Sequence, residues 1–109
     1  VHAPTASAMR KAGEVATPLH NNCSGKHAGM LALSKYLGAL GQDYRDIEHP
    51  VQQLNLLNLA ALAEVAPASI PVAVDGCSVP TFALPLQAAA RAFSRRNSSF
   101  ADGAANTSL

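Results

Sequence analysis

The 109-residue sequence predicts a mixed α/β fold that is rich in helix. Apolar residues recur at helical spacing in three separate segments, whereas only the run from Ile70 to Val74 has the composition of a strand. A hydrophobic content of 49% allows a core, and the length fits one domain at most. We therefore expect several helices and one buried strand, which delivers Asp75 and Cys77 into a turn.

The helix limits follow from apolar faces and from capping residues. Ser24 or Asn22 is a plausible N-cap for the first long helix, and Gly38 and Gly41 supply its stop signal. Pro50 occupies a tolerated first position in the next one. The predicted helices are a short one around Ala6 to Lys11, then Lys26 to Leu40, a segment that begins at His49-Pro50, and roughly Leu84 to Arg96.

The predicted helices differ in how much apolar surface they present. The one that begins at Pro50 is apolar on most sides, with a narrow polar stripe formed by Gln52, Asn55 and Asn58, and a helix of this kind is normally surrounded by protein. The last helix is predicted to turn Phe82, Leu86, Ala89 and Phe93 to the core and Gln87, Arg91 and Arg95 to water.

Composition and charge argue against several classes of function. Charged residues make up 14% of the chain, below the roughly 25% usual for soluble domains, so much of the surface is expected to face other protein. The net charge is +1 and no stripe of basic residues is present, which argues against nucleic-acid binding. No apolar stretch is long enough for a membrane span. Two cysteines are too few for a disulfide scaffold, and we expect a cytoplasmic protein.

A first group of reactive side chains comprises Cys23, Lys26 and Cys77. Cys23 and Lys26 lie at the start of a predicted helix, where the partial positive charge of the helix end and the neighbouring ammonium both favour the thiolate. Thiolates bind zinc, and a lysine amine can also donate a lone pair once it is neutral. Three ligands with an open fourth position would match a catalytic zinc site. Two other interpretations remain open, namely inert buried thiols and a Cys23–Cys77 disulfide.

The neighbouring residues exclude two familiar motifs. Ser24-Gly25-Lys26 lacks the preceding glycine of a phosphate-binding loop, and its serine and lysine are one position too close for a Ser-x-x-Lys pair. His27 could hydrogen-bond a carboxylate, and Asp75 could receive an amine. His49 is interpreted as a helix cap and His20 as a loop anchor, so both are assigned structural roles.

With these residues identified, the chain resembles the asparaginase II family. The segment Leu19–Met30, with its run Asn21-Asn22-Cys23-Ser24-Gly25-Lys26-His27, is similar to the most distinctive motif of that family. His49-Pro50-Val51-Gln52 and the segment Val74–Leu86 match further blocks in order and spacing. Together these blocks cover most of residues 1–96, and three blocks in sequence are far more specific than one.

The resemblance implies an activity and a set of site residues. The family hydrolyses L-asparagine to L-aspartate and ammonia on a fold like that of serine β-lactamases and penicillin-binding proteins, of which this chain would form a partial domain. Its serine nucleophile is activated by lysine, and a zinc ion lies beside the substrate. The matching positions assign zinc to Cys23, Lys26 and Cys77, and the substrate pocket to His27 and Asp75.

The chain departs from the family pattern in one important respect. It has no Ser-x-x-Lys pair, so we expect the nucleophilic serine outside these residues and no hydrolysis by the isolated chain. We interpret residues 1–96 as a central fragment of the family domain and residues 97–109 as a low-information, disordered tail, where the resemblance fades. The alternatives are a non-catalytic metal-binding remnant and a structural fragment with a Cys23–Cys77 disulfide. L-Asparagine is the expected small-molecule partner, and a homodimer is expected for the full-length form.

Overall fold

The computed structural model describes residues 2–106, with side chains described for residues 2–97. Within that part the chain is rich in helix and contains one small two-stranded sheet, so the predicted mixed α/β, helix-rich class is confirmed. The elements in chain order are α1 (Ala3–Lys11), the 3₁₀ helix η1 (Pro18–His20), α2 (Ser24–Tyr36), α3 (Pro50–Ala63), the 3₁₀ helix η2 (Pro67–Ser69), β1 (Val72–Val74), β2 (Pro80–Phe82) and α4 (Leu86–Asn106).

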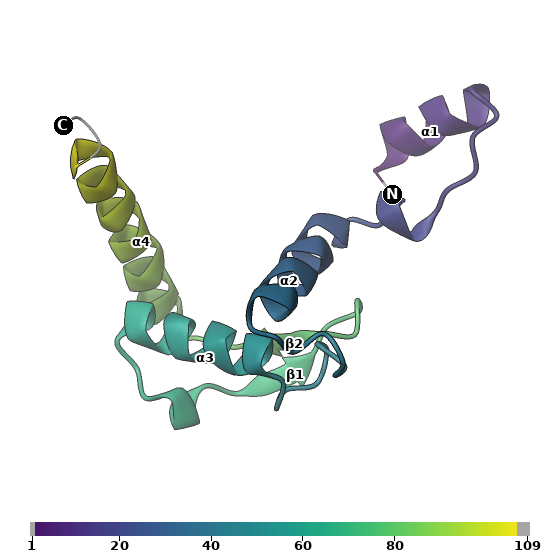
Figure 1. Ribbon diagram of the computed structural model, residues 1–109. Helices are drawn as coiled ribbons and strands as arrows, with labels where there is room; N and C mark the ends of the chain where they lie inside the picture. The colour runs from purple at the N-terminus through teal and green to yellow at the C-terminus, as the bar shows by residue number, and fades with distance from the viewer. Residues whose placement is uncertain (1, 107–109) are drawn as a thin grey trace.

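The helices spread outwards instead of closing around one centre. In Figure 1, α3 lies across the middle, α4 and α2 rise from its two sides, the two strands overlap its right-hand end in this view, and α1 stands apart beyond α2. The radius of gyration is 17.5 Å, whereas a compact domain of this length has one of about 13 Å. The described chain is therefore open, with its packing divided between two junctions of α3.

The junction of α3 with α4 forms the apolar core. Ala63 on α3 packs with Ala88 and Ala92 on α4, and Leu62, Val65 and Leu84 flank these small residues. Leu86 and Phe93, which the sequence assigns to the core, are 86% and 68% exposed. The prediction is therefore wrong for Leu86 and Phe93, because alanines allow α4 to approach α3 closely where larger side chains would not fit.

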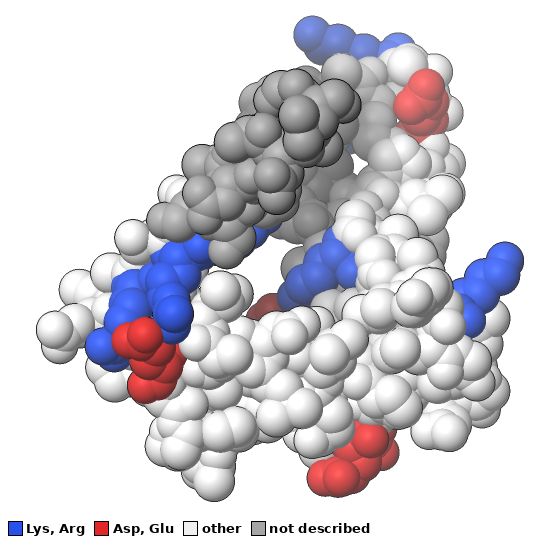
Figure 2. Space-filling view, turned by 60° about the vertical axis from the view of Figure 1, so that its left-hand side comes forward, with Lys and Arg blue, Asp and Glu red and all other residues white. Residues whose placement is uncertain are grey.

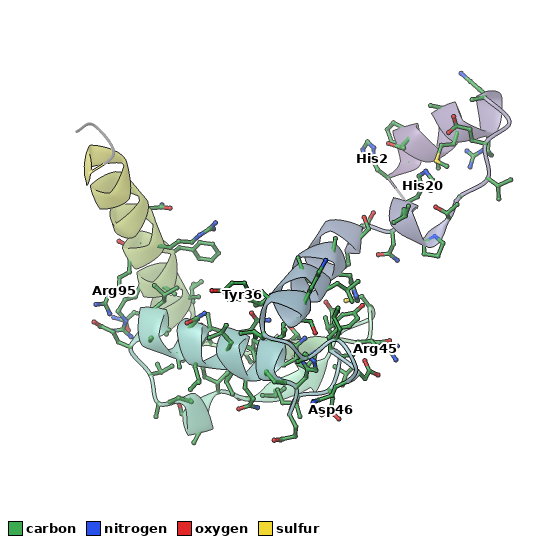
Figure 3. All side chains as sticks on the ribbon, viewed as in Figure 1. His2, His20, Tyr36, Arg45, Asp46 and Arg95 are labelled. Carbon is green, nitrogen blue, oxygen red and sulfur yellow. The ribbon has the colours of Figure 1, made fainter. Side chains whose placement is uncertain are left out.

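Two arginines of α4 also contact the C-terminal end of α3. The sequence places Arg91 and Arg95 on the wet side, and both are exposed. Arg91 Nε also donates a hydrogen bond to the carbonyl oxygen of Ala63 (2.9 Å). Arg95 forms an ion pair with Glu64 at 2.6 Å, at the corner where α3 meets α4 in Figure 3. Both cations lie at the C-terminal end of α3, where the helix dipole favours positive charge. Their pairing turns Ala88 and Ala92 toward the core.

The junction of α2 with α3 depends on His49, which is buried at the start of α3. Its Nδ1 accepts a hydrogen bond from the backbone N–H of Val51 (3.1 Å), so the predicted helix cap is confirmed. Its Nε2 lies 3.0 Å from the carbonyl oxygen of Ala39 and 3.3 Å from the hydroxyl of Ser34. One imidazole thus joins the start of α3 to the end of α2.

Gln52 completes this junction. The sequence places it on a polar stripe, but its side chain is fully buried. Its Nε2 donates to the carbonyl oxygen of Tyr44 at 2.7 Å and lies 3.2 Å from the sulfur of Met30 on α2. This polar side chain can be buried because the loop between α2 and α3 folds back over it and supplies a hydrogen-bond acceptor.

The ends of α2 differ from the predicted ones. Its N-cap is Cys23, not Ser24 or Asn22, and no side-chain hydrogen bond caps it. The helix ends at Tyr36, before the predicted limit at Leu40, because Gly38 adopts a left-handed conformation (φ +70°) that glycine tolerates. The predicted stop signal at Gly38 is thereby confirmed.

The strand prediction is partly wrong. β1 pairs antiparallel with β2, with Val72 opposite Phe82 and Val74 opposite Pro80, and all three β1 residues are exposed. The expected buried strand is thus one half of an exposed hairpin, and only Ile70 ahead of it is buried. The second strand went unpredicted because it begins at a proline and has three residues.

The last helix extends further than predicted. The backbone of α4 is helical to Asn106, so the helix end expected near Arg96 is wrong. That residues 97–109 form a separate tail stays a prediction, since side chains beyond Asn97 and residues 107–109 lie outside the described residues. Among the described helices, none is both long and apolar enough to cross a membrane.

Replacement of Gln52 by Ala is expected to lower the free energy of unfolding by about 1–3 kcal/mol, because the buried carbonyl of Tyr44 would lose its donor. Urea unfolding followed by circular dichroism measures the change. Gln87→Ala, at an exposed position of α4, is the matched control and should change stability little. Equal effects of the two substitutions would contradict the role given to Gln52.

The loop between α2 and α3 also contains a pH-dependent contact. Hydrogen bonds from the Arg45 guanidinium and backbone hold the pKa of Asp43 at about 2, below the ordinary value of 3.8. A carboxyl whose pKa is lower in the folded chain stabilises it above pH 3.8, and this stabilisation is lost as the pH falls toward about 2. Acid titration of stability should therefore be steeper between these values in the wild type than in Arg45→Gln. Identical pH profiles would disprove the contact.

Candidate functional site

The turn between β1 and β2 meets the first turn of α2. Lys26 Nζ lies 3.3 Å from Asp75 Oδ2, although the two residues are 49 positions apart in the sequence. The thiol of Cys77 donates to the same carboxylate oxygen at 3.6 Å. The hairpin makes this meeting possible: Asp75 N donates to the Val79 carbonyl, and Ser78, at a left-handed φ of 71°, turns the chain back. The side chains therefore cluster because two local turns face each other.

Cys23 joins this cluster from the start of α2. Its backbone N–H donates to the side-chain oxygen of Asn21 (2.9 Å), which holds the loop before the helix. The neighbouring thiol of Cys77 raises the pKa of the Cys23 thiol. The structure thus brings together Cys23, Lys26 and Cys77, as the sequence predicts. Both cysteines are free thiols, so the alternative of a Cys23–Cys77 disulfide is not the state seen here.

The charges within the cluster compensate one another. The backbone N–H of Gly76 and then the ammonium of Lys26 lower the pKa of Asp75. The hydrogen bond with Cys77 and the contact with Asp75 raise the pKa of Lys26. The structure therefore favours an ion pair between Lys26 and Asp75, whose side chains are 43% and 47% exposed.

The pKa of Cys23 is shifted in the opposite direction from the predicted one. Its hydrogen bond with Cys77, followed by burial, raises the pKa of Cys23, and these effects outweigh the opposite effect of the Lys26 charge. The sequence argument for a thiolate at the helix start is therefore wrong for this arrangement. The reason is that a second thiol and a carboxylate lie nearby, and both disfavour another negative charge.

The donor atoms of the cluster suit a zinc ion. Two thiols and one amine are within the ligand chemistry of zinc, once all three are deprotonated. No group of three or more His, Cys, Asp and Glu side chains in the described residues forms a metal-binding arrangement. A three-ligand site at this place would therefore require the amine of Lys26, and its raised pKa means that a proton must leave first.

His27, the next residue on α2, faces a different environment from Lys26. It lines a pocket of about 380 Å³ together with Cys77, Tyr44, Ser24, Asn21 and four apolar residues. Its Nδ1 lies 2.6 Å from the hydroxyl of Tyr44. Asp75 is not among the lining residues of this pocket, but it contacts Cys77, which is one of them.

Lys26 lines a second, wider depression of about 560 Å³, together with Gln52, Asn55 and Thr81. Cys77 lines the first pocket and contacts Asp75, so the cluster lies between the two hollows.

The sequence analysis assigned no functional role to Tyr44, because its segment has the composition of a connecting loop. A lone aromatic residue in a polar loop was the available signal.

The two histidines assigned structural roles have partners close to them in the sequence. His20 Nδ1 accepts from the backbone N–H of Thr17 at 2.9 Å and lies 3.0 Å from its hydroxyl, which closes η1. This confirms the loop anchor. His49 caps α3 in the same manner. Among His20, His27 and His49, only His27 lines the 380 Å³ pocket.

The chain was compared with known proteins. No curated protein matches it. The family model described as L-asparaginase II matches residues 1–108. The matched range passes beyond Arg96, so the family likeness does not fade where the sequence analysis places its limit. A family model that spans nearly every residue, together with the meeting of the three motif segments, identifies the chain as a member of the L-asparaginase II family, a family of amidohydrolases.

Proposed function

We propose that the chain carries the zinc-binding and substrate-binding half of an L-asparaginase site on a partial serine β-lactamase-like domain. Cys23, Lys26 and Cys77 would hold the zinc, while His27 and Asp75 would contact L-asparagine. The observation that carries this proposal is the meeting of the α2 start with the β1–β2 turn, marked by the 3.3 Å contact between Lys26 and Asp75.

The charge distribution supports these roles. An α-ammonium group needs an ionised carboxylate, and the backbone N–H of Gly76 together with Lys26 keeps Asp75 ionised by lowering its pKa. An α-carboxylate needs a hydrogen-bond donor, and the imidazole of His27 lines the pocket beside Cys77. Lys26 now occupies the position of a counterion to Asp75, so binding of an amino acid would replace one cation by another.

A zinc ion at this place would supply positive charge that polarises a substrate oxygen. The chain's own residues would then do the rest of the binding. Lys26 must release its proton and leave Asp75, which frees the carboxylate for the substrate amine. Cys77 would give up its hydrogen bond to Asp75 in the same exchange.

The serine-lysine nucleophile has no counterpart in this sequence, which contains no Ser-x-x-Lys pair. We propose that it is supplied from outside these 109 residues, so that the chain binds without catalysing hydrolysis. A cytoplasmic location and a homodimer of the full-length form are further proposals, and both rest on the resemblance.

Zinc is expected to bind the purified chain with a stoichiometry of about one, and Lys26→Met should weaken binding by at least tenfold, because the third ligand is lost. Native mass spectrometry and a competitive zinc-chelator titration measure this. Lys35→Met is the matched control, since Lys35 is an exposed lysine on the same helix. Equal zinc affinity of the two variants would exclude Lys26 as a ligand.

The purified chain should release no ammonia from L-asparagine, because it lacks a Ser-x-x-Lys pair. A coupled ammonia assay with zinc present tests this expectation. L-Asparagine binding is measured separately by calorimetry, with Glu64→Gln as control for Asp75→Asn, since both carboxylates are paired with a cation at the surface. Ammonia release above background would disprove the placement of the nucleophile.

A further inference from the structure

We infer that Tyr44 is a positioning residue for this site: its phenol hydroxyl fixes the ring orientation and the tautomer of His27, so that His27 Nε2–H is presented to a bound amino acid. The inference rests on the substrate role proposed for His27. It concerns a residue that lies in the loop between α2 and α3, outside the three motif blocks.

The geometry of the pair is specific. The hydroxyl of Tyr44 and Nδ1 of His27 are 2.6 Å apart, which is a short hydrogen bond. The two rings meet edge to face, with centroids 5.7 Å apart and an interplanar angle of 84°. An edge-to-face contact of this kind adds to the stability of an aromatic pair. The imidazole is thus held at one nitrogen and against one ring face.

The hydrogen bond determines which nitrogen remains for a ligand. We assign the phenol as the donor to Nδ1, and this assignment places the ring proton on Nε2. His27 and Tyr44 both line the 380 Å³ pocket, with Cys77 beside them. An Nε2–H group is a donor and suits an anionic acceptor such as the α-carboxylate of an amino acid.

Tyr44 is itself held in place by the surrounding chain. Gln52, buried on α3, donates to the Tyr44 carbonyl oxygen at 2.7 Å. Asp43 and Arg45, on either side of Tyr44, form hydrogen bonds with each other at 2.8 and 2.7 Å. The loop position of the phenol is therefore set by a buried amide and by a salt bridge, and neither of these contacts involves His27.

His20 and His49 show what a contact that closes a turn or a cap looks like here. Each accepts from a backbone N–H within three residues, and His49 also reaches the hydroxyl of Ser34, 15 positions away, through its other ring nitrogen. The partner of His27 comes from 17 positions away and is a side chain. Such a contact orients a ring relative to another element, which is what a ligand-binding imidazole needs.

The test uses the whole chain labelled with ¹⁵N at histidine, at one pH near 8.5 where an ordinary imidazole is neutral. Two-bond ¹⁵N spectra report the tautomer of each ring. The wild type should show His27 as the Nε2–H form. Tyr44→Phe keeps the aromatic ring but removes the hydroxyl, so His27 should become a mixture of tautomers. Tyr36→Phe removes a hydroxyl from a side chain on α2 that is 85% exposed and should leave His27 unchanged.

A second readout is the affinity for L-asparagine, measured by calorimetry on the same proteins. Tyr44→Phe should weaken binding by about threefold to tenfold, the effect of one misoriented hydrogen-bond donor, and Tyr36→Phe should not. An unchanged His27 tautomer in Tyr44→Phe overturns the inference, and so does a wild-type spectrum that already shows a mixture.

The experiments distinguish the substrate role proposed for His27 from the positioning role inferred for Tyr44. A tautomer change in Tyr44→Phe with no L-asparagine binding by the wild type would support the positioning of His27 and overturn its substrate role. L-Asparagine binding that is equal in the wild type and Tyr44→Phe, with an unchanged tautomer, would support the proposed function and overturn the role of Tyr44. Should Tyr44→Phe fail to fold, the wild-type spectrum still decides the matter.

Discussion

The buried side-chain amide of Gln52 is the interaction on which the arrangement of α2, α3 and their connecting loop depends. It lies on α3, donates to the carbonyl oxygen of Tyr44 and contacts the sulfur of Met30 on α2. A buried amide without partners costs several kcal/mol on transfer from water, so these groups are held in register. Through Tyr44 the same constraint reaches His27, which connects the packing of the helices with the lining of the pocket.

The charged and polar side chains of the cluster beside this junction are already paired with one another. Lys26 balances Asp75, Cys77 donates to the same carboxylate, and the pKa of Cys23 is raised by its hydrogen bond with Cys77 and by burial. A cation or an amino acid that binds here must therefore replace existing contacts. Because ligand atoms must lose protons, binding of a metal at such a site is linked to proton release. Because the ion pair of Lys26 and Asp75 is exposed, breaking it should lower the stability of the fold only slightly.

The open shape of the chain leaves much apolar surface in contact with solvent. The face in Figure 2 is predominantly uncharged, with Lys and Arg groups in small separate patches, some of them next to Asp or Glu. Leu86 and Phe93 on α4 and Tyr36 on α2 are among the exposed large apolar side chains. Packing in the described part relies on alanines between α3 and α4 and on polar contacts between α2 and α3. Such a core is small, which is consistent with the large radius of gyration.

The sequence by itself determined the four helices, one of the two strands and the residues of the cluster: the helix stop at Gly38, the cap at His49, the turn at Asp75 to Cys77, and the motif spacing that identifies the family. These are local properties, set by backbone conformation and by side chains a few positions apart. Only the tertiary structure decided which large side chains of α4 are buried, whether β1 is covered, the direction in which the pKa of Cys23 shifts and the contact between Tyr44 and His27. Each of these depends on groups that are distant in the sequence, and no periodicity reports the charge or the hydrogen-bond partner that another segment brings.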